Sequence, residues 1–293
     1  MTKKRRKIIL EFIIFTSPVI LLFLLTYIYP FISGFIYMFT DWNGISSKIT
    51  FVGLENFSNI FSESSGFVNS VSFTIRLTAV VVPVSNLLAL AFALILDMDL
   101  KLRNFIRTLL FMPNVITLII IGFMWQFVFT NTFESLYKYT GLDFFNWSWL
   151  GDERLAFWSV AVVCIWQVVG FYMVIYISGL QTVNQEVLEA SIIDGAGRWQ
   201  RFYHIILPFI VPAITIALFL SISNTLRTFD IPFVLTKGGP GFATRTVVFN
   251  IYEEAFKKNN YGLGSAKAFI LFVATALITL IQVLVLKRKE VEN

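Results

Sequence analysis

The side chains that could do chemistry in this chain are few, and most are neutral hydrogen-bonding groups. One set is a stripe of hydroxyl and amide groups spaced three or four residues apart: Ser221, Asn224, Thr225 and Thr228. At about 100° per residue, side chains with this spacing share one face of a helix. The single histidine, His204, and the single cysteine, Cys164, lie far apart in the sequence. They therefore indicate neither a metal cluster nor a catalytic dyad.

A second set falls along one side of an earlier apolar segment and comprises Gln167, Gly170, Phe171 and Ser178. Amide and hydroxyl groups beside an aromatic ring suit a sugar, which needs many hydrogen bonds and a flat face for stacking. The same groups would also serve as hydrogen bonds between helices, at about 0.6 kcal/mol for each bond. Both interpretations stay open here. The candidate solute-pathway residues are Gln167, Phe171, Ser221, Asn224, Thr225 and Thr228.

The third group is a polar island between two long apolar runs, Glu189–Pro208, which reads E-A-S-I-I-D-G-A-G-R-W-Q-R-F-Y-H-I-I-L-P. Thr182 with Gln185 fits a capping box for a helix that starts near Gln185, and Asn184 is a competing N-cap. The G-A-G stretch permits the left-handed turn that ends such a helix. A second short helix, rich in aromatic residues, would then lead into the next apolar run.

This island places small side chains next to aromatic ones, and it has no core of its own to fill. Glu189 lies near the start of the first helix, where the helix dipole favours a carboxylate, so capping alone is one explanation for it. Capping does not explain the small and aromatic residues. A short amphipathic helix that cannot bury its own apolar side generally docks into a groove of a partner. We therefore predict that another protein binds to this island.

The composition indicates that the elements around these residues lie in lipid. The 293 residues are 57% hydrophobic and only 14% charged, with a mean hydropathy of +0.75, whereas soluble domains are about 25% charged. The net charge of +5 forms no stripe of the kind that binds nucleic acid, because eight basic residues cluster near the two ends of the chain. With one cysteine, no disulfide framework exists, and Cys164 is expected to pack as a small buried residue.

Six segments approach or exceed the roughly 20 apolar residues that a transmembrane helix needs. We therefore predict an all-α membrane protein with six transmembrane helices. The first segment is too long for a cleaved signal peptide and is interpreted as a retained anchor helix, kinked or ended near Pro30. The predicted spans are approximately Ile8–Phe35, Val71–Leu96, Phe105–Phe129, Leu155–Leu180, Ile205–Ile222 and Ala266–Leu286.

Basic residues set the expected orientation, because loops on the cytoplasmic side carry an excess of lysine and arginine. The basic stretches at 3–7 and 287–289 place both termini in the cytoplasm, on the side of the polar island. Arg76 then lies near the external end of the second span, where snorkelling explains it. A short external helix is expected within 246–258. The expected organisation is an anchor helix and first external loop (1–70), a permease core (71–286) with a cytoplasmic loop at 181–208, and a cytoplasmic tail (287–293).

The island resembles the EAA loop of ABC-importer permeases, whose pattern is E-A-A, a glycine after a short gap, and then I-x-L-P; Ser191 stands where the family usually has its second alanine. Three further stretches resemble the carbohydrate branch of that family: F-V-G-L-E-N-F at 51–57, L-T-K-G-G-P at 235–240 and Y-G-L-G-S-A at 261–266. The resemblance covers nearly the whole chain. It implies the MetI-like permease fold of type I importers, in a bacterial cell membrane.

The resemblance also implies a transport subunit rather than an enzyme. Its implied partners are a second homologous permease, two ATPase subunits and an extracytoplasmic sugar-binding protein. ATP and Mg²⁺ would be bound by the ATPase subunits, and no cofactor is expected here; the chain has no G-x-x-x-x-G-K-[ST] stretch. The residues implied in ATPase coupling are Glu189, Ala190, Ser191, Asp194, Gly195, Ala196, Trp199, Phe202, Leu207 and Pro208.

Three alternatives remain. A secondary transporter would commonly show inverted repeats and ionisable groups at membrane depth, whereas this sequence shows no repeat and almost no such groups. An intramembrane enzyme would need a catalytic dyad or metal cluster in the membrane. The third alternative lies inside the family and is a permease for a non-sugar solute such as an amino acid or a polyamine.

Overall fold

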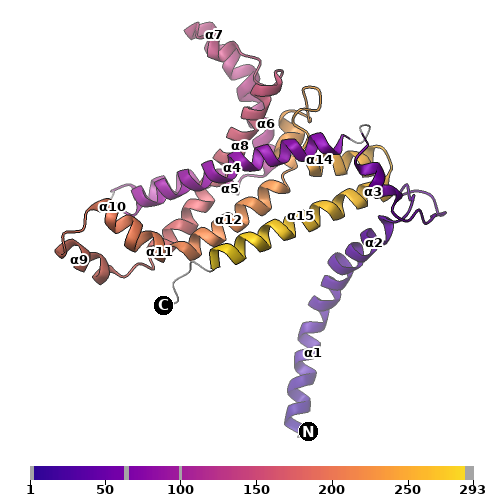
Figure 1. Cartoon of the computed structure of the whole chain (residues 1–293), viewed down its shortest axis with the longest axis horizontal. Coiled ribbons are helices and arrows are strands. Elements are labelled where there is room, and N and C mark those ends of the chain that lie inside the picture. The colour runs from indigo at the N-terminus through magenta and orange to yellow at the C-terminus, as the bar shows by residue number, and fades with distance from the viewer. Residues whose placement is uncertain (1–2, 63–65, 99–100, 288–293) are drawn as a thin grey trace. The chain divides into compact units, whose positions relative to one another are not determined.

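The structure is a computed structural model that describes residues 3–62, 66–98 and 101–287 (Figure 1). Within these ranges the chain is helical apart from turns and one isolated antiparallel bridge, between Thr40 and Phe51. Its α-helices are α1 (Lys3–Phe23), α2 (Tyr29–Tyr37), α3 (Glu55–Ile60), α4 (Phe67–Leu96), α5 (Arg103–Val115), α6 (Leu118–Phe127), α7 (Phe133–Thr140), α8 (Glu153–Leu180), α9 (Gln185–Ile193), α10 (Arg198–Arg201), α11 (Leu207–Phe209), α12 (Val211–Leu226), α13 (Asp230–Leu235), α14 (Val247–Tyr252) and α15 (Tyr261–Lys287).

Five helical segments of the described chain are long and apolar enough to cross a membrane: Glu11–Tyr37, Phe67–Leu96, Glu153–Leu180, Val211–Leu235 and Tyr261–Leu286. A sixth crossing would be formed by Arg103–Val115 and Leu118–Thr140, which meet at a bend of 100°. The all-helical class and the set of five or six spans confirm the sequence-based prediction. In the first span, a π-helical turn at Leu24–Ile28 directly precedes Pro30.

The third predicted span is not the straight helix that was expected from Phe105 to Phe129. The chain bends where Ile116 and Thr117 take extended conformations, with ψ of 137° and 132°. Pro113 lies in the last turn of α5. A proline in that position supplies no backbone donor and crowds the preceding turn, which favours a break in the helix.

The chain forms two compact units, one of Met1–Ser65 with Ile251–Ile270 and one of Gly66–Asn250 with Leu271–Asn293. The division at 70 and 286 expected from the sequence stays a prediction, and all of the 287–293 tail except the backbone of Lys287 lies outside the described residues. In the smaller unit, the buried amide of Asn56 donates hydrogen bonds to the carbonyl oxygens of Met38 and Thr40, at 2.9 and 2.8 Å. These bonds fasten the end of the first span to the loop that follows it.

The Y-G-L-G-S-A stretch has a packing role in the smaller unit. A side chain at Gly262 would collide with the carbonyl oxygen of Thr40, and one at Gly264 would come within 2.9 Å of the Ala255 side chain. The backbone amide of Gly262 also donates to the carbonyl oxygen of Trp42 at 3.0 Å. Both glycines therefore permit close approach, Gly262 to a segment that is distant in sequence and Gly264 to the turn that precedes its own helix.

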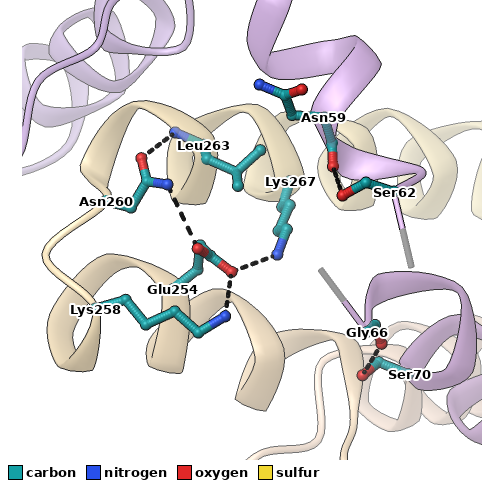
Figure 2. A network of polar contacts seen from close by, with 9 residues as sticks. All are labelled: Asn59, Ser62, Gly66, Ser70, Glu254, Lys258, Asn260, Leu263 and Lys267. Atoms are coloured by element: carbon teal, nitrogen blue, oxygen red, sulfur yellow. Dashed lines mark hydrogen bonds and ion pairs between the residues drawn. The ribbon is translucent and has the colours of Figure 1, made fainter. Parts of the chain in front are cut away.

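A buried ion pair also joins two parts of the smaller unit (Figure 2). The Lys267 ammonium group is fully buried and donates to a carboxylate oxygen of Glu254 at 2.8 Å. Lys258 reaches the same oxygen at 3.2 Å, and Asn260 donates to the other at 3.4 Å. Burial raises the pKa of the Glu254 carboxyl, but the hydrogen bond and charge of Lys267, with a smaller effect of Lys258, outweigh it and leave that pKa below its ordinary value. Sequence analysis did not single out this pair.

The helix predicted within 246–258 is present as α14 and a π-helical turn at Glu253–Lys257, which carries Glu254, and its external location stays a prediction. The turn is followed by α15, so the Glu254–Lys267 pair closes a helical hairpin. This pair lies at the external end of the last span under the proposed orientation.

The larger unit is built around α4, α8 and α12. Its inner core joins Ala89 and Ala93 of α4, Met173 of α8, and Ala213 and Ala217 of α12. Small residues allow these helices to approach closely, as is usual for packing within membranes. A side chain at Gly179 would come within 2.6 Å of the Ala213 side chain, and one at Gly170 would strike the carbonyl oxygen of Leu110 in α5.

The outer core of the same unit brings α6 and α13 against α4 and α8. Phe73 and Leu77 of α4 pack with Ile121 of α6, Val160 of α8 and Leu235 of α13. Cys164 is buried within this core, as expected. This packing involves the first half of α8, which also carries one of the predicted polar stripes; the other stripe lies on α12 and the residues directly after it.

Candidate functional site

A cavity of about 590 Å³ opens within the larger unit. Its walls come mainly from α8, from the last turn of α12 and from the segment between α12 and α13. The polar groups that line it are Asn114, Gln167, Tyr172, Asn224, Thr225, Arg227, Thr228 and Asp230, and its aromatic groups include Phe171 and Phe229.

Five of the six candidate solute-pathway residues line this one cavity: Gln167, Phe171, Asn224, Thr225 and Thr228. Two stripes that are about 50 residues apart in the sequence therefore face the same space. The arrangement offers amide and hydroxyl donors and acceptors beside an aromatic ring. Ligand pockets of this size commonly combine apolar walls with a few polar groups that fix the ligand's orientation.

Ser221, the sixth candidate, lies outside the cavity wall and is 1% exposed. Its hydroxyl accepts a hydrogen bond of 3.0 Å from the side-chain amide of Asn86, in α4. Asn86 in turn accepts a bond of 2.8 Å from the hydroxyl of Tyr176, in α8. The interhelical interpretation left open above therefore describes the contacts of Ser221.

Asn86, Tyr176 and Ser221 form a buried polar junction of α4, α8 and α12. The junction adjoins the cavity, because Tyr172 and Thr225 lie one helical turn away on α8 and α12 and both line the wall. Asn86 and Tyr176 were missed in the sequence. An asparagine in the middle of an apolar span was the available signal, since a polar residue at membrane depth usually has a partner.

Two charged side chains in the cavity wall were also missed, Arg227 and Asp230. The Arg227 guanidinium donates to the carbonyl oxygen and the hydroxyl of Ser223, at 2.9 and 2.7 Å. Asp230 is the first residue of α13. Together they give this wall one positive and one negative group, so it carries no large net charge.

The polar island forms two short helices, α9 and α10, that follow the C-terminal end of α8 (Figure 1). Asn184 is the N-cap of α9, because its side-chain oxygen accepts from the backbone amide of Glu186 at 2.8 Å. The capping box expected from Thr182 and Gln185 is absent, since the Thr182 hydroxyl donates to the carbonyl oxygen of Gly179 instead. Asparagine's short polar side chain is well suited to the cap.

Gly195 carries the turn between α9 and α10 with a φ of +79°, a left-handed conformation that few residues other than glycine adopt easily. The amide of Ala196 closes the turn on the carbonyl oxygen of Ser191 at 2.9 Å. The capping role considered for Glu189 receives no support from its contact, because its carboxylate accepts from the Gln185 side chain at 3.3 Å rather than from a backbone amide. The turn thus has a defined shape and leaves Glu189 accessible.

The island exposes apolar groups as well as polar ones. Ile193 is 87% exposed and Trp199 is 74% exposed. Of the ten candidate coupling residues, Ser191 is buried and bonds to its own helix. Glu189, Ala190, Asp194, Gly195 and Trp199 are exposed, and Ala196, Phe202, Leu207 and Pro208 are half-buried.

Comparison with known proteins identifies the family. The profile of the family described as "Binding-protein-dependent transport system inner membrane component" matches residues 85–291. The chain belongs to this family. It is a multi-pass inner membrane permease, the transmembrane component of an ABC importer, and is not itself an enzyme. In the described residues, no group of three or more histidine, cysteine and acidic side chains is placed to hold a metal ion.

This binding-protein-dependent permease has several relatives named for sugar transport. It is 37% identical to the probable starch degradation products transport system permease protein AmyD of Thermoanaerobacterium thermosulfurigenes, over 95% of this chain and 94% of that one. It is 30% identical to the multiple sugar-binding transport system permease protein MsmF of Streptococcus mutans, over 90% of each chain. One chain in the crystal structure of a bacterial ABC transporter involved in the import of the acidic polysaccharide alginate has the same fold, with a TM-score of 0.82 at 20% identity and coverage of 98% of this chain and 99% of that one.

Proposed function

We propose that this permease imports a sugar of oligosaccharide size, driven by ATP hydrolysis on partner subunits. The cavity in the larger unit would form part of the solute path, with Gln167, Asn224 and Thr228 exchanging hydrogen bonds with sugar hydroxyls. Phe171 would offer an aromatic face for stacking. The hydroxyl and amide lining favours a polyhydroxylated solute, and the names of the relatives AmyD and MsmF point to the same class.

The proposed transport mechanism rests on the position of the polar island between α8 and α12. The segment 181–210 joins α8 directly to α12, and these two helices, together with the residues directly after α12, supply most of the cavity wall. A displacement of α9 and α10 is therefore transmitted to both walls through covalent connections. The exposed Ile193 and Trp199 give a partner an apolar surface to grip. We propose that an ATPase subunit binds there and that its movement changes which side of the membrane the cavity faces.

This assignment places the island and both termini in the cytoplasm. The complete transporter would contain a second homologous permease, two ATPase subunits that bind ATP and Mg²⁺, and an extracytoplasmic sugar-binding protein. The bound solute shifts the permease between an outward-facing and an inward-facing state only if it interacts differently with the two.

A second candidate within the family is a permease for a non-sugar solute, and Arg227 with Asp230 is the observation that favours it. A guanidinium and a carboxylate in one wall would suit a solute that carries both charges, such as an amino acid. The neutral groups outnumber this pair in the cavity. We therefore favour a sugar over an amino acid as the transported solute.

The test is uptake by proteoliposomes that contain the complete transporter, ATP and the binding protein. A panel of labelled solutes would include neutral oligosaccharides of two to six units, uronic-acid oligosaccharides, amino acids and polyamines. ATP-dependent uptake of a neutral oligosaccharide is expected. Uptake of amino acids or polyamines alone would contradict the sugar assignment, and uptake that continues without ATP but stops when an ion gradient collapses would contradict the ATP-driven mechanism.

A further inference from the structure

A second hollow, of about 380 Å³, opens in the larger unit at the start of α4 and α8. Arg76 of α4 and Arg154 of α8 both line it. The side chains of Glu153 and Trp158 line it from α8, and Ala243 lines it from the segment before α14. The hollow shares no lining residue with the larger cavity.

The lengths of the two helices place the hollow at the membrane surface or beyond it. About 20 helical residues cross the hydrocarbon layer, and the part of α4 that follows Arg76, residues 77–96, supplies that number. Arg154 is the second residue of α8, which has 28 residues. The hollow lies at the opposite end of α8 from α9 and α10. It is therefore on the outer face if the proposed orientation is correct.

The two arginines differ from several lysines that lie outside the spans or near their ends and form ion pairs. Lys138 pairs with Glu134 at 2.7 Å, Lys257 with Glu253 at 3.2 Å, and Lys267 with Glu254 at 2.8 Å. Neither arginine of the hollow forms an ion pair within the described part of the chain, and Arg76 reaches only the carbonyl oxygen of Ser72, at 3.4 Å.

Glu153, which shares the hollow, forms no ion pair with either arginine. One of its carboxylate oxygens lies 3.3 Å from the position that a side-chain carbon on Gly241 would occupy, so the group is turned toward the loop around Gly241. The hollow is therefore lined by two exposed arginines and one carboxylate residue, and a guanidinium group can donate two parallel hydrogen bonds to a carboxylate. Trp158, which is 50% exposed, adds an aromatic rim. Arginine and tryptophan are enriched among the residues that dominate protein–protein binding.

We propose that this hollow receives an acidic side chain of the extracytoplasmic binding protein when that protein docks on the permease. The proposal rests on the proposed orientation. The family's dependence on a binding protein supplies the partner, and the unpaired arginines supply the charge complementarity. Charged groups at the margin of an interface mainly accelerate association and make it sensitive to salt. The hollow would therefore determine the concentration of binding protein that half-maximally stimulates the transporter. The maximal rate of the transport cycle would be unchanged.

The experiment uses the complete transporter in phosphatidylcholine nanodiscs and titrates it with its sugar-loaded binding protein. The readout is the binding-protein concentration that gives half-maximal stimulation of ATP hydrolysis, at low and at high salt. Arg76→Glu and Arg154→Glu are the test variants, and Arg154→Lys conserves the charge. Lys48→Glu is the matched control, because it reverses an exposed lysine of the first external loop that does not line the hollow.

Each Arg→Glu change is expected to raise the half-maximal concentration about tenfold or more at low salt and by less at high salt. The basal rate and the rate at saturating binding protein should stay at parental values, and Arg154→Lys should behave nearly like the parent. If the reversals prevent assembly, as judged by gel filtration, Arg76→Gln and Arg154→Gln replace them, with a smaller rise expected.

An unchanged half-maximal concentration would overturn the proposal, and so would an equal rise for Lys48→Glu. A lipid phosphate is the rival occupant. It would be indicated if the variants altered only the basal rate, and only in nanodiscs that contain phosphatidylglycerol, which also overturns the proposal. Failure of the proposed function would look different, because the parental transporter itself would then show no sugar uptake stimulated by the binding protein.

Discussion

The side-chain amide of Asn86 donates a hydrogen bond of 3.0 Å to the hydroxyl of Ser221, which is 135 residues away in the sequence. Tyr176 completes the junction from a third helix. Each of these three residues is at most 6% exposed. The junction thus joins three helices beside the proposed solute path. On α8 and α12 it lies one helical turn from residues that line the cavity.

Replacing Asn86 with leucine removes both interhelical bonds and leaves the Tyr176 hydroxyl buried without its acceptor. We expect a loss of stability of about 1 kcal/mol, in the range measured for hydrogen bonds between membrane helices. Thermal unfolding of the purified transporter would measure it. Thr26→Val is the matched control, since Thr26 bonds only to the carbonyl oxygen of Leu22 in its own exposed helix. Equal effects of the two changes would argue against the importance of the junction.

Asn224 and Thr228 are expected to contact the solute. Asn224→Ala and Thr228→Val should each lower ATP-dependent uptake about fivefold or more, because each removes a hydrogen bond worth about 1 kcal/mol in a confined site. Ser178→Ala serves as the control, because Ser178 belongs to the predicted stripe on α8 but does not line the cavity. The rate of uptake and the amount of assembled transporter would be measured together. Loss of uptake in Ser178→Ala alone would contradict the assignment of the path.

Gly195 is expected to be essential for coupling. A valine there would be forced into a left-handed conformation that costs at least about 1 kcal/mol, and the turn between α9 and α10 would shift. Sugar uptake should be abolished while the spans still assemble. Gly195→Asn is the informative control, since asparagine tolerates this conformation and no atom lies within 4 Å of the added side-chain carbon. Normal uptake by the valine variant would count against the coupling role.

The Glu254–Lys267 pair predicts a dependence of stability on pH. The pKa of Glu254 is lower in the folded protein than its ordinary value of 4.5. Its stabilising contribution is therefore complete above about pH 4.5 and is lost as the pH falls through the lowered value. Thermal unfolding of the parent across pH 3–7 would reveal the loss, and Glu254→Gln should remove that part of the pH dependence. Retention of the full acid-induced change in Glu254→Gln would assign it to other groups.

At neutral pH, Glu254→Gln should also destabilise the protein by roughly 3 kcal/mol, because it removes the negative charge of Glu254 from beside the fully buried Lys267. Glu134→Gln is the matched control. Glu134 pairs with Lys138 at 2.7 Å, but both side chains are more than 60% exposed, and exposed pairs contribute little to stability. A similar loss in both variants would contradict the special role of the buried pair.

Much of this architecture could be predicted from the sequence, because apolar length and basic flanks are local signals. Long apolar runs predicted the spans, and the polar island predicted two short helices with a turn at Gly195. The bend at Ile116–Thr117 was missed because Pro113 alone does not say whether a helix continues. The partner of Ser221 was missed because Asn86 lies 135 residues away, and no local pattern indicates which polar residues of different helices will meet.

The central claim is that movement of the α9–α10 loop opens the cavity. Its most direct test is the reaction of Thr228→Cys, in a Cys164→Ala background, with a membrane-impermeant maleimide applied from outside. We predict faster labelling when ATP hydrolysis is trapped with vanadate than without nucleotide, and no such acceleration when Gly195→Val is also present. Equal labelling in the two nucleotide states of the parent, or an undiminished acceleration in the Gly195→Val variant, would contradict the account.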